Sequence, residues 1–181
     1  MSLGVYLFRN IRTNQILATT EKSILARPNL VKSQIKPNQR PSTLRPDHWI
    51  PLVAATGFES KKAQDDVFML ASQNGHPLIP PAKAEQREYL LKKNKDKKIA
   101  EMDMVERQVA QLARTFIYID KLKPQTVKQV GAQIKLFWQD RSWIKKIEDA
   151  GLYWPEWVAH DDLELKRGSI IVNPELRSST H

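Results

Sequence analysis

Two short apolar segments, separated by a basic and proline-rich connector, constrain the fold of this chain more than any other feature. Val5–Phe8 and Ile50–Ala55 consist mainly of apolar, β-branched or aromatic residues and are bounded by polar turn formers. This pattern is typical of buried strands. Residues 15–19 follow a turn that contains two asparagines, which tolerate the backbone conformations of a hairpin. We therefore expect a small N-terminal sheet.

Helical spacing of apolar residues follows this sheet segment. Residues 59–74 carry their apolar side chains at helical intervals, and Gly75 stands where a helix would end, so a helix that covers the sheet is predicted. A short helix with Leu30, Val31 and Ile35 on its buried side is expected before the connector. The connector itself, residues 36–48, contains three prolines and predicts an extended surface loop.

The second half of the chain begins with a long helical pattern. Residues 82–112 contain no proline or glycine and predict one long helix, or two helices with a break near Asn94. The β-branched and aromatic residues 116–119 predict a strand. Residues 126–138 fit either a strand or a helix, and alternating apolar residues from Ile134 favour the strand. A helix near residues 142–150 and a short-strand finish are expected after it.

These elements define an α+β fold class with three parts. Residues 1–76 are expected to form a basic α+β core domain with a small sheet and its covering helix. Residues 77–115 are expected to form a proline-rich spacer and a long basic helical arm. Residues 116–181 are expected to form an aromatic-rich C-terminal α+β part with short strands.

Positive charge is concentrated in the first two parts. The formal net charge is +9, and the sequence pI is about 9.8. Residues 1–60 contain 8 basic and 3 acidic side chains, whereas residues 124–181 contain 8 of each. A polarised excess of this kind indicates a polyanionic partner such as nucleic acid, and a general solubility surplus is the alternative interpretation.

The sequence offers no pattern for catalysis. Cysteine is absent, which excludes disulfides and thiolate chemistry. The glycines form no phosphate-binding loop, and the histidines have no metal-binding spacing; residues 160–162, His-Asp-Asp, are expected to form an acidic turn. No apolar run approaches the roughly 18 residues of a membrane span. We therefore expect no enzymatic activity, cofactor, metal, small-molecule substrate or membrane span.

Cationic residues in segments that cannot be buried are the candidate binding residues. The lysine run at 92–98 either contacts phosphate or forms a solvated helix face. Trp49 is interpreted first as a core anchor, and the alternative is that it stacks on a base. The candidates for nucleic-acid binding are Arg9, Arg12, Arg27, Lys36, Arg40, Arg45, His48, Lys92, Lys93, Lys95, Lys97 and Lys98.

Two stretches also resemble a known family. VYLFRNIRTNQIL at residues 5–17 and LRPDHWIPL at residues 44–52 resemble the fungal mitochondrial family of transcriptional regulators of mitochondrial recombination, and Trp154, Pro155 and His160 carry a looser likeness. Members of that family also occur in the mitochondrial large ribosomal subunit. The resemblance implies a location in the mitochondrial matrix and contact with ribosomal RNA and neighbouring mitochondrial ribosomal proteins.

The resemblance leaves two interpretations of function. The first is a structural component of the mitochondrial large ribosomal subunit that binds rRNA through basic surfaces. The alternative is a mitochondrial DNA-binding protein that acts in homologous recombination or transcription. The family has no motif of catalytic residues, so the resemblance adds no active site.

Overall fold

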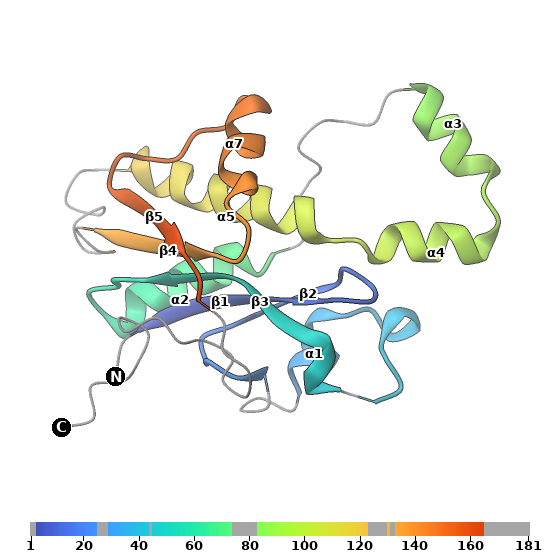
Figure 1. The fold of residues 1–181 in the computed structure, drawn as a ribbon, viewed down its shortest axis with the longest axis horizontal. Helices are drawn as coiled ribbons and strands as arrows, with labels where there is room; N and C mark the ends of the chain where they lie inside the picture. Colours follow the sequence, from blue (N-terminus) through green and yellow to red (C-terminus); the bar gives the residue numbers. More distant parts are fainter. Residues whose placement is uncertain are drawn as a thin grey trace.

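The computed structural model describes residues 3–24, 29–43, 45–73, 83–122, 130 and 133–164. A five-stranded sheet lies at its centre, in the order β2-β1-β3-β4-β5 (Figure 1). Neighbouring strands are antiparallel, except that β4 and β5 are parallel. The strands are β1 (Gly4–Asn10), β2 (Ile16–Thr19), β3 (Trp49–Thr56), β4 (Ile134–Trp138) and β5 (Val158–Asp162). The predicted α+β class is confirmed.

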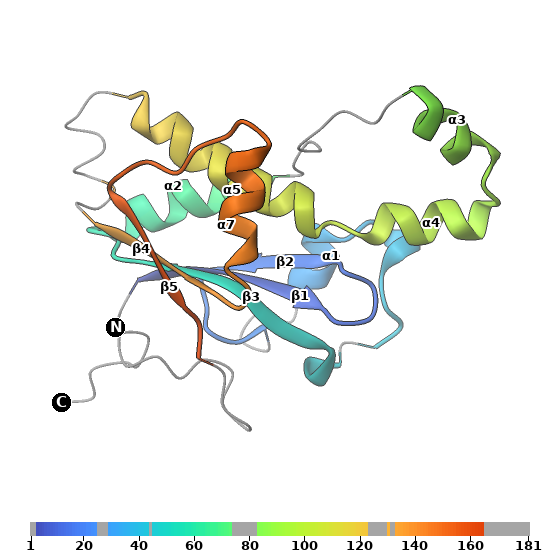
Figure 2. The ribbon, with the colours of Figure 1, turned by 45° about the horizontal axis from the view of Figure 1, so that its top comes forward.

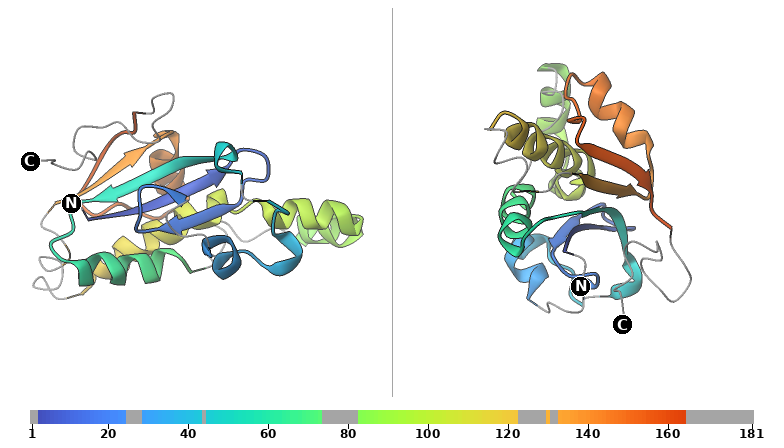
Figure 3. Two further views of the ribbon diagram at one scale, coloured as in Figure 1. Left: turned by 90° about the horizontal axis from the view of Figure 1, so that it is seen from below. Right: turned by 90° about the vertical axis from the view of Figure 1, so that its left-hand side faces the viewer.

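Helices cover both faces of the sheet (Figures 1 and 3). One face packs against α2 (Lys61–Ala71), α5 (Val105–Asp120) and α7 (Ser142–Asp149). The other face packs against α1 (Leu30–Gln34). The connector after α1 contains two single-turn 3₁₀ helices, η2 (Pro37–Gln39) and η3 (Pro46–His48).

Two further helices form an arm that extends away from the sheet (Figures 1 and 2). These are α3 (Lys83–Leu91) and α4 (Asn94–Met102), and neither contains a buried residue. The predicted break near Asn94 is confirmed, because α4 begins at this residue. A second break at Asp103 and Met104, between α4 and α5, was not predicted.

Strand β1 is buried on both faces, which explains the uninterrupted apolar run in its sequence. Val5 and Leu7 belong to the core cluster that includes α2 and α5. Tyr6 and Phe8 belong to the cluster on the opposite face, with the apolar residues of α1. Successive side chains of a strand point to opposite faces, so residues 5–8, which contact a core cluster on each face, are apolar or aromatic at every position.

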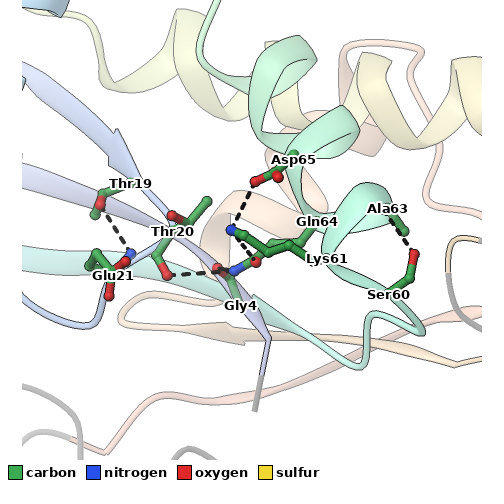
Figure 4. A network of polar contacts seen from close by, with 9 residues as sticks. All are labelled: Gly4, Thr19, Thr20, Glu21, Ser60, Lys61, Ala63, Gln64 and Asp65. Carbon is green, nitrogen blue, oxygen red and sulfur yellow. Dashed lines mark hydrogen bonds and ion pairs between the residues drawn. The ribbon is translucent and has the colours of Figure 1, made fainter. Parts of the chain in front are cut away.

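The predicted hairpin and covering helix are also confirmed. The side-chain oxygen of Asn10 accepts the backbone N–H groups of Arg12 and Thr13, and Asn14 adopts a left-handed φ of 56°. Helix α2 is capped by Ser60 and attached to the sheet by Gln64, whose side-chain nitrogen donates to the backbone carbonyls of Gly4 and Thr20 (Figure 4).

The N-terminal strands and the later strand β4 meet closely beside Gly57. This residue has a φ of +93°, and a Cβ atom there would lie 2.5 Å from the carbonyl oxygen of Gln133. Glycine therefore meets both a backbone and a steric requirement at this position. Residues 134–138 form β4, so the preference for a strand there is confirmed.

Two predictions of local structure were wrong. Residues 116–119 belong to α5, because Leu112, Phe116 and Ile119 are buried at helical spacing whereas Tyr118 is 56% exposed. The helical period of the longer segment outweighs the local β propensity. Residues 160–162 form the end of β5 and not a turn.

Some predictions concern residues outside the described part of the chain. They are the helix end at Gly75, the proline-rich spacer at 77–81 and the strands after residue 164. The division at residues 76 and 115 stays a prediction. The sheet itself combines strands from the first and third of the expected parts.

Candidate nucleic-acid interface

Five of the predicted binding residues line one surface groove of about 440 Å³. We call it the basic groove. Its walls come from the β1–β2 turn, the connector around η2 and η3, and α4. The five cationic or titratable residues are Arg12, Arg40, Arg45, His48 and Lys98, and the other lining residues are Asn10, Thr13, Gln15, Gln39, Pro41, Ser42, Thr43 and Met102.

Hydrogen bonds fix the β1–β2 turn against the arm and the connector. The side-chain amide of Asn14 donates to Asp103 Oδ2 at 2.9 Å, and the backbone N–H of Met104 donates to the carbonyl of Asn14 at 3.0 Å. The N–H of Ile11 donates to the carbonyl of His48 at 2.8 Å. Residues distant in sequence are thereby held on one surface.

Trp49 anchors the end of the connector. Its side chain is 3% exposed and lies in the same core cluster as Phe8, so the predicted core role is confirmed. Trp49 is the first residue of β3 and lies opposite Asn10 in the β1–β3 ladder. Arg45, just before η3, and His48, the last residue of η3, are therefore attached to a fixed point of the sheet.

The cations of the groove differ in whether they already have hydrogen-bond or ion-pair partners. Arg40 donates to the carbonyls of Ile35 and Lys32 at 2.9 and 2.7 Å, and so caps the end of α1. Arg45 makes a two-point contact with Asp47 at 2.9 and 3.3 Å. The hydrogen bond from Arg45 is the main reason that the pKa of Asp47 is lowered.

Arg12 and Lys98 are the more available cations. Both side chains are exposed, and within the described residues neither takes part in a hydrogen bond or an ion pair. Arginine and lysine side chains in this state can neutralise phosphate without first losing a partner. The turn and α4 thus present two uncommitted charges to the same groove.

The floor of the groove is neutral and already hydrogen-bonded. Asn10, Gln15 and Gln39 are buried polar residues. Gln15 donates to the carbonyl of Gln39 at 2.9 Å, and Gln39 donates to Glu101 Oε2 at 3.4 Å. No lining residue of this groove is acidic. The side-chain N–H groups of Gln15 and Gln39 are thus already engaged and are poorly suited to reading a base sequence.

The remaining predicted residues lie elsewhere. Lys36 lines a smaller cavity with Arg107, and Arg9 lines a separate cavity beside α7. Lys97 lies 5.8 Å from the centre of the Tyr89 ring and helps to join the two arm helices. The other arm lysines, Lys92, Lys93 and Lys95, are exposed, and Arg27 lies outside the described residues.

Sequence reasoning missed Arg107 and Lys146. Arg107 lies in the first turns of α5, and Lys146 lies on α7 above the Trp143 ring, 4.5 Å from its centre. Both belong to segments of nearly balanced charge, so local charge excess gave no signal. Their proximity depends on the contact between α5 and α7 in the folded chain.

Most aromatic residues near cations serve the core. The buried ones are Tyr6, Phe8, Trp49, Phe137 and Trp138. Trp138 donates from Nε1 to His160 Nδ1 at 2.9 Å. Burial, together with the positive charge of Arg141, lowers the pKa of His160 from 6.5 to about 4. This histidine is a neutral structural acceptor near pH 7.

Across the described ranges, no group of three or more acidic or histidine side chains has the geometry of a metal site. Within the same ranges, no helix has both the length and the apolar character needed to cross a membrane. Of the three cavities described here, the basic groove is lined by the most predicted binding residues.

An α+β body with clustered cations on an exposed groove is typical of proteins that bind a polyanionic backbone. Residues 3–71 match the family model described as transcriptional regulation of mitochondrial recombination. The resemblance noted in the sequence is thus confirmed for the part of the chain from β1 to α2.

A curated relative agrees with this match. The chain is 34% identical over 71 residues to a protein of Schizosaccharomyces pombe named "Large ribosomal subunit protein mL67". The match covers 36% of this chain and 40% of the relative's length. The family match includes Arg12, Arg40, Arg45 and His48 of the basic groove, whereas Lys98 lies beyond it.

Proposed function

We propose that this protein is a structural component of the mitochondrial large ribosomal subunit and binds ribosomal RNA through the basic groove. The observation that carries the proposal is the position of five predicted binding residues on one groove without an acidic lining residue. The name of the S. pombe relative supports the ribosomal assignment. The family description supports a mitochondrial location, which we propose to be the matrix.

The groove would act by neutralising and positioning phosphates. Arg12 and Lys98 would make direct contacts, and Arg40 would add charge from a position fixed by two backbone carbonyls. The charge of Arg45 is offset by its ion pair with Asp47. The floor amides already have hydrogen-bond partners, so binding would depend weakly on base sequence. This role requires no catalytic group or cofactor.

The arm would extend the same basic surface. Lys95 lies on α4, and Lys92 and Lys93 lie in the link between α3 and α4, two helices that have no buried residues. Exposed lysines at these positions can reach phosphates beyond the groove. The neighbouring Leu90 and Leu91 are 68% and 86% exposed, and they offer apolar contact to an adjacent ribosomal protein.

The experiment is co-sedimentation of the tagged chain with mitochondrial large subunits in a sucrose gradient at high salt. The proposal predicts a stable and stoichiometric association. It also predicts that the variant with Arg12→Gln and Lys98→Gln is released at lower salt than the wild type. A control with Lys62→Gln and Lys145→Gln removes the same charge from α2 and α7 and should remain bound.

The family description supports a second candidate, a DNA-binding protein in mitochondrial recombination or transcription. Phosphate contacts do not distinguish RNA from DNA, so the same groove would serve both polymers. In the gradient, this alternative predicts a free pool that sediments near the top. That pool should bind DNA in a strongly salt-dependent manner and should lack stoichiometric large-subunit RNA.

A further inference from the structure

A second cavity, of about 370 Å³, lies between β1, the start of α5 and α7. It shares no lining residue with the basic groove. Three cations from three different elements line it: Arg9 of β1, Arg107 of α5 and Lys146 of α7. The other lining residues are Asn14, Asp103, Val105, Glu106 and Trp143.

Arg9 lines this cavity and carries an unsatisfied donor. Its Nε atom is buried and has no hydrogen-bond partner within the described residues. A guanidinium remains charged at all ordinary pH values, so it cannot avoid the cost of burial by losing a proton. An acceptor supplied from outside the chain would satisfy this donor.

Two nearby carboxylates, those of Asp103 and Asp140, are already engaged with other groups. Asp103 accepts from Asn14 at 2.9 Å and from the N–H of Val105 at 3.3 Å. Asp140 accepts from the N–H of Ser142 at 2.9 Å. Its pKa is lowered mainly by its hydrogen bonds with Ser142 and in small part by the charge of Arg9. Neither carboxylate supplies a hydrogen bond to Arg9 Nε.

Lys146, on α7, also lines the cavity and is loosely paired. Its ammonium group lies 4.5 Å from the centre of the Trp143 ring. Its distance to Glu106 Oε2 is 3.9 Å, which is longer than a direct charge-assisted hydrogen bond. The lysine is therefore held in place by the indole and can still donate to a stronger anion.

We infer that this cavity is a phosphate-binding site in which Arg9 and Lys146 hold the anion and Arg107 adds positive charge. A phosphate oxygen provides the acceptor that Arg9 Nε lacks, and guanidinium groups bind phosphate with charge-assisted hydrogen bonds. The phosphate belongs either to a nucleic-acid backbone or to a small phosphate compound. Binding of a nucleic-acid phosphate rests on the proposed function, whereas binding of a small phosphate compound does not.

The test is an NMR titration of the arginine Nε–Hε signals with inorganic phosphate, with chloride used to keep the ionic strength constant. The Arg9 signal is assigned by its loss in Arg9→Lys. The inference predicts a saturable shift of this signal. Lys146→Gln should weaken the apparent affinity by about tenfold, the effect of losing one charged hydrogen bond. The adjacent and exposed Lys145→Gln should leave it unchanged.

Two results would overturn the site. One is the absence of a saturable Arg9 shift in protein whose spectrum is otherwise that of the folded wild type. The other is equal weakening by Lys145→Gln and Lys146→Gln, which would indicate a general effect of net charge. The partly exposed Lys146 leaves the fold intact on replacement, so the comparison does not depend on the stability of Arg9 variants.

The two phosphate sources are separated by repeating the titration with adenosine monophosphate and with an RNA oligomer. A backbone source predicts that RNA shifts Arg9 at far lower concentration than the mononucleotide. A small-compound source predicts that the mononucleotide shifts Arg9 and RNA does not. Either pattern supports the phosphate site, and the second would count against a role for this cavity in RNA binding while leaving the basic groove to its own test.

Discussion

Replacing Trp49 with alanine should destabilise the protein and weaken nucleic-acid binding together. The indole is 3% exposed and packs in the cluster that contains Phe8, so its removal leaves a cavity between the sheet and the connector. Truncation of a buried tryptophan typically costs about 3–5 kcal/mol. For a chain of this size, each kcal/mol lowers the melting temperature by about 2–4 °C. The expected decrease is therefore at least about 6 °C.

The assay is thermal unfolding followed by circular dichroism, with RNA affinity measured at a temperature where the variant remains folded. Tyr118→Ala is the control, because this aromatic residue is 56% exposed and should cost much less. Binding should weaken because Arg45 and His48 lose their attachment to the sheet. A Trp49→Ala variant that unfolds at the wild-type temperature would refute the anchoring role.

Three other predictions concern the body of the protein. Gln64→Ala leaves the buried carbonyls of Gly4 and Thr20 without this donor and should lower the free energy of unfolding by about 1–3 kcal/mol. Lys61→Ala, on the exposed side of the same helix, should lower it by less than about 1 kcal/mol, and urea denaturation measures both changes. Gly57→Ala should destabilise the protein more than Gly151→Ala. Both residues have positive φ, but only at Gly57 would the added Cβ atom clash with a backbone carbonyl, and equal losses of stability would contradict this. The pKa of His160 is about 4 in the folded chain against 6.5 for the free side chain, so the unfolded chain takes up the proton first and stability should fall as the pH is lowered from about 6.5 through about 4. The denaturation midpoint of His160→Gln should fall less over this range, and an equal fall would exclude His160 as a cause.

The strands near the N-terminus were predictable because their signals are local. Val5–Phe8 is apolar at every position, and a segment of this kind fits a strand that is buried on both faces. The hairpin depends on Asn10 and Asn14, whose turn chemistry is visible in the sequence. Burial of Trp49 followed from its size and from its position at the start of a strand.

The segment containing Phe116 shows where local signals fail. Four β-branched or aromatic residues in succession favour a strand, but the helix around them presents Leu112, Phe116 and Ile119 to the core. The period of the whole segment decides its structure, since tertiary packing outweighs a preference of less than about 1 kcal/mol per residue. A longer window would have detected the helix.

The candidate site was predictable in its residue types and not in its grouping. Charge excess identified Arg12 and Lys98 separately, as two residues whose numbers differ by 86. Their position on one groove results from the contact of Asn14 with Asp103 and Met104, which no sequence pattern indicates. For the same reason, the sequence did not indicate that Arg9 and Arg12, three positions apart, line different cavities.

The most direct measurement of the central claim is the salt dependence of binding to a single-stranded rRNA fragment. Each phosphate contact contributes about 0.7 to the slope of log affinity against log salt concentration. The account predicts that the variant with Arg12→Gln and Lys98→Gln lowers this slope by about 1.4, nearly equally for RNA fragments of different sequence. The charge-matched variant with Lys62→Gln and Lys145→Gln should retain almost the full wild-type slope. An unchanged slope in the groove variant, or an equal decrease in both variants, would contradict binding through the basic groove.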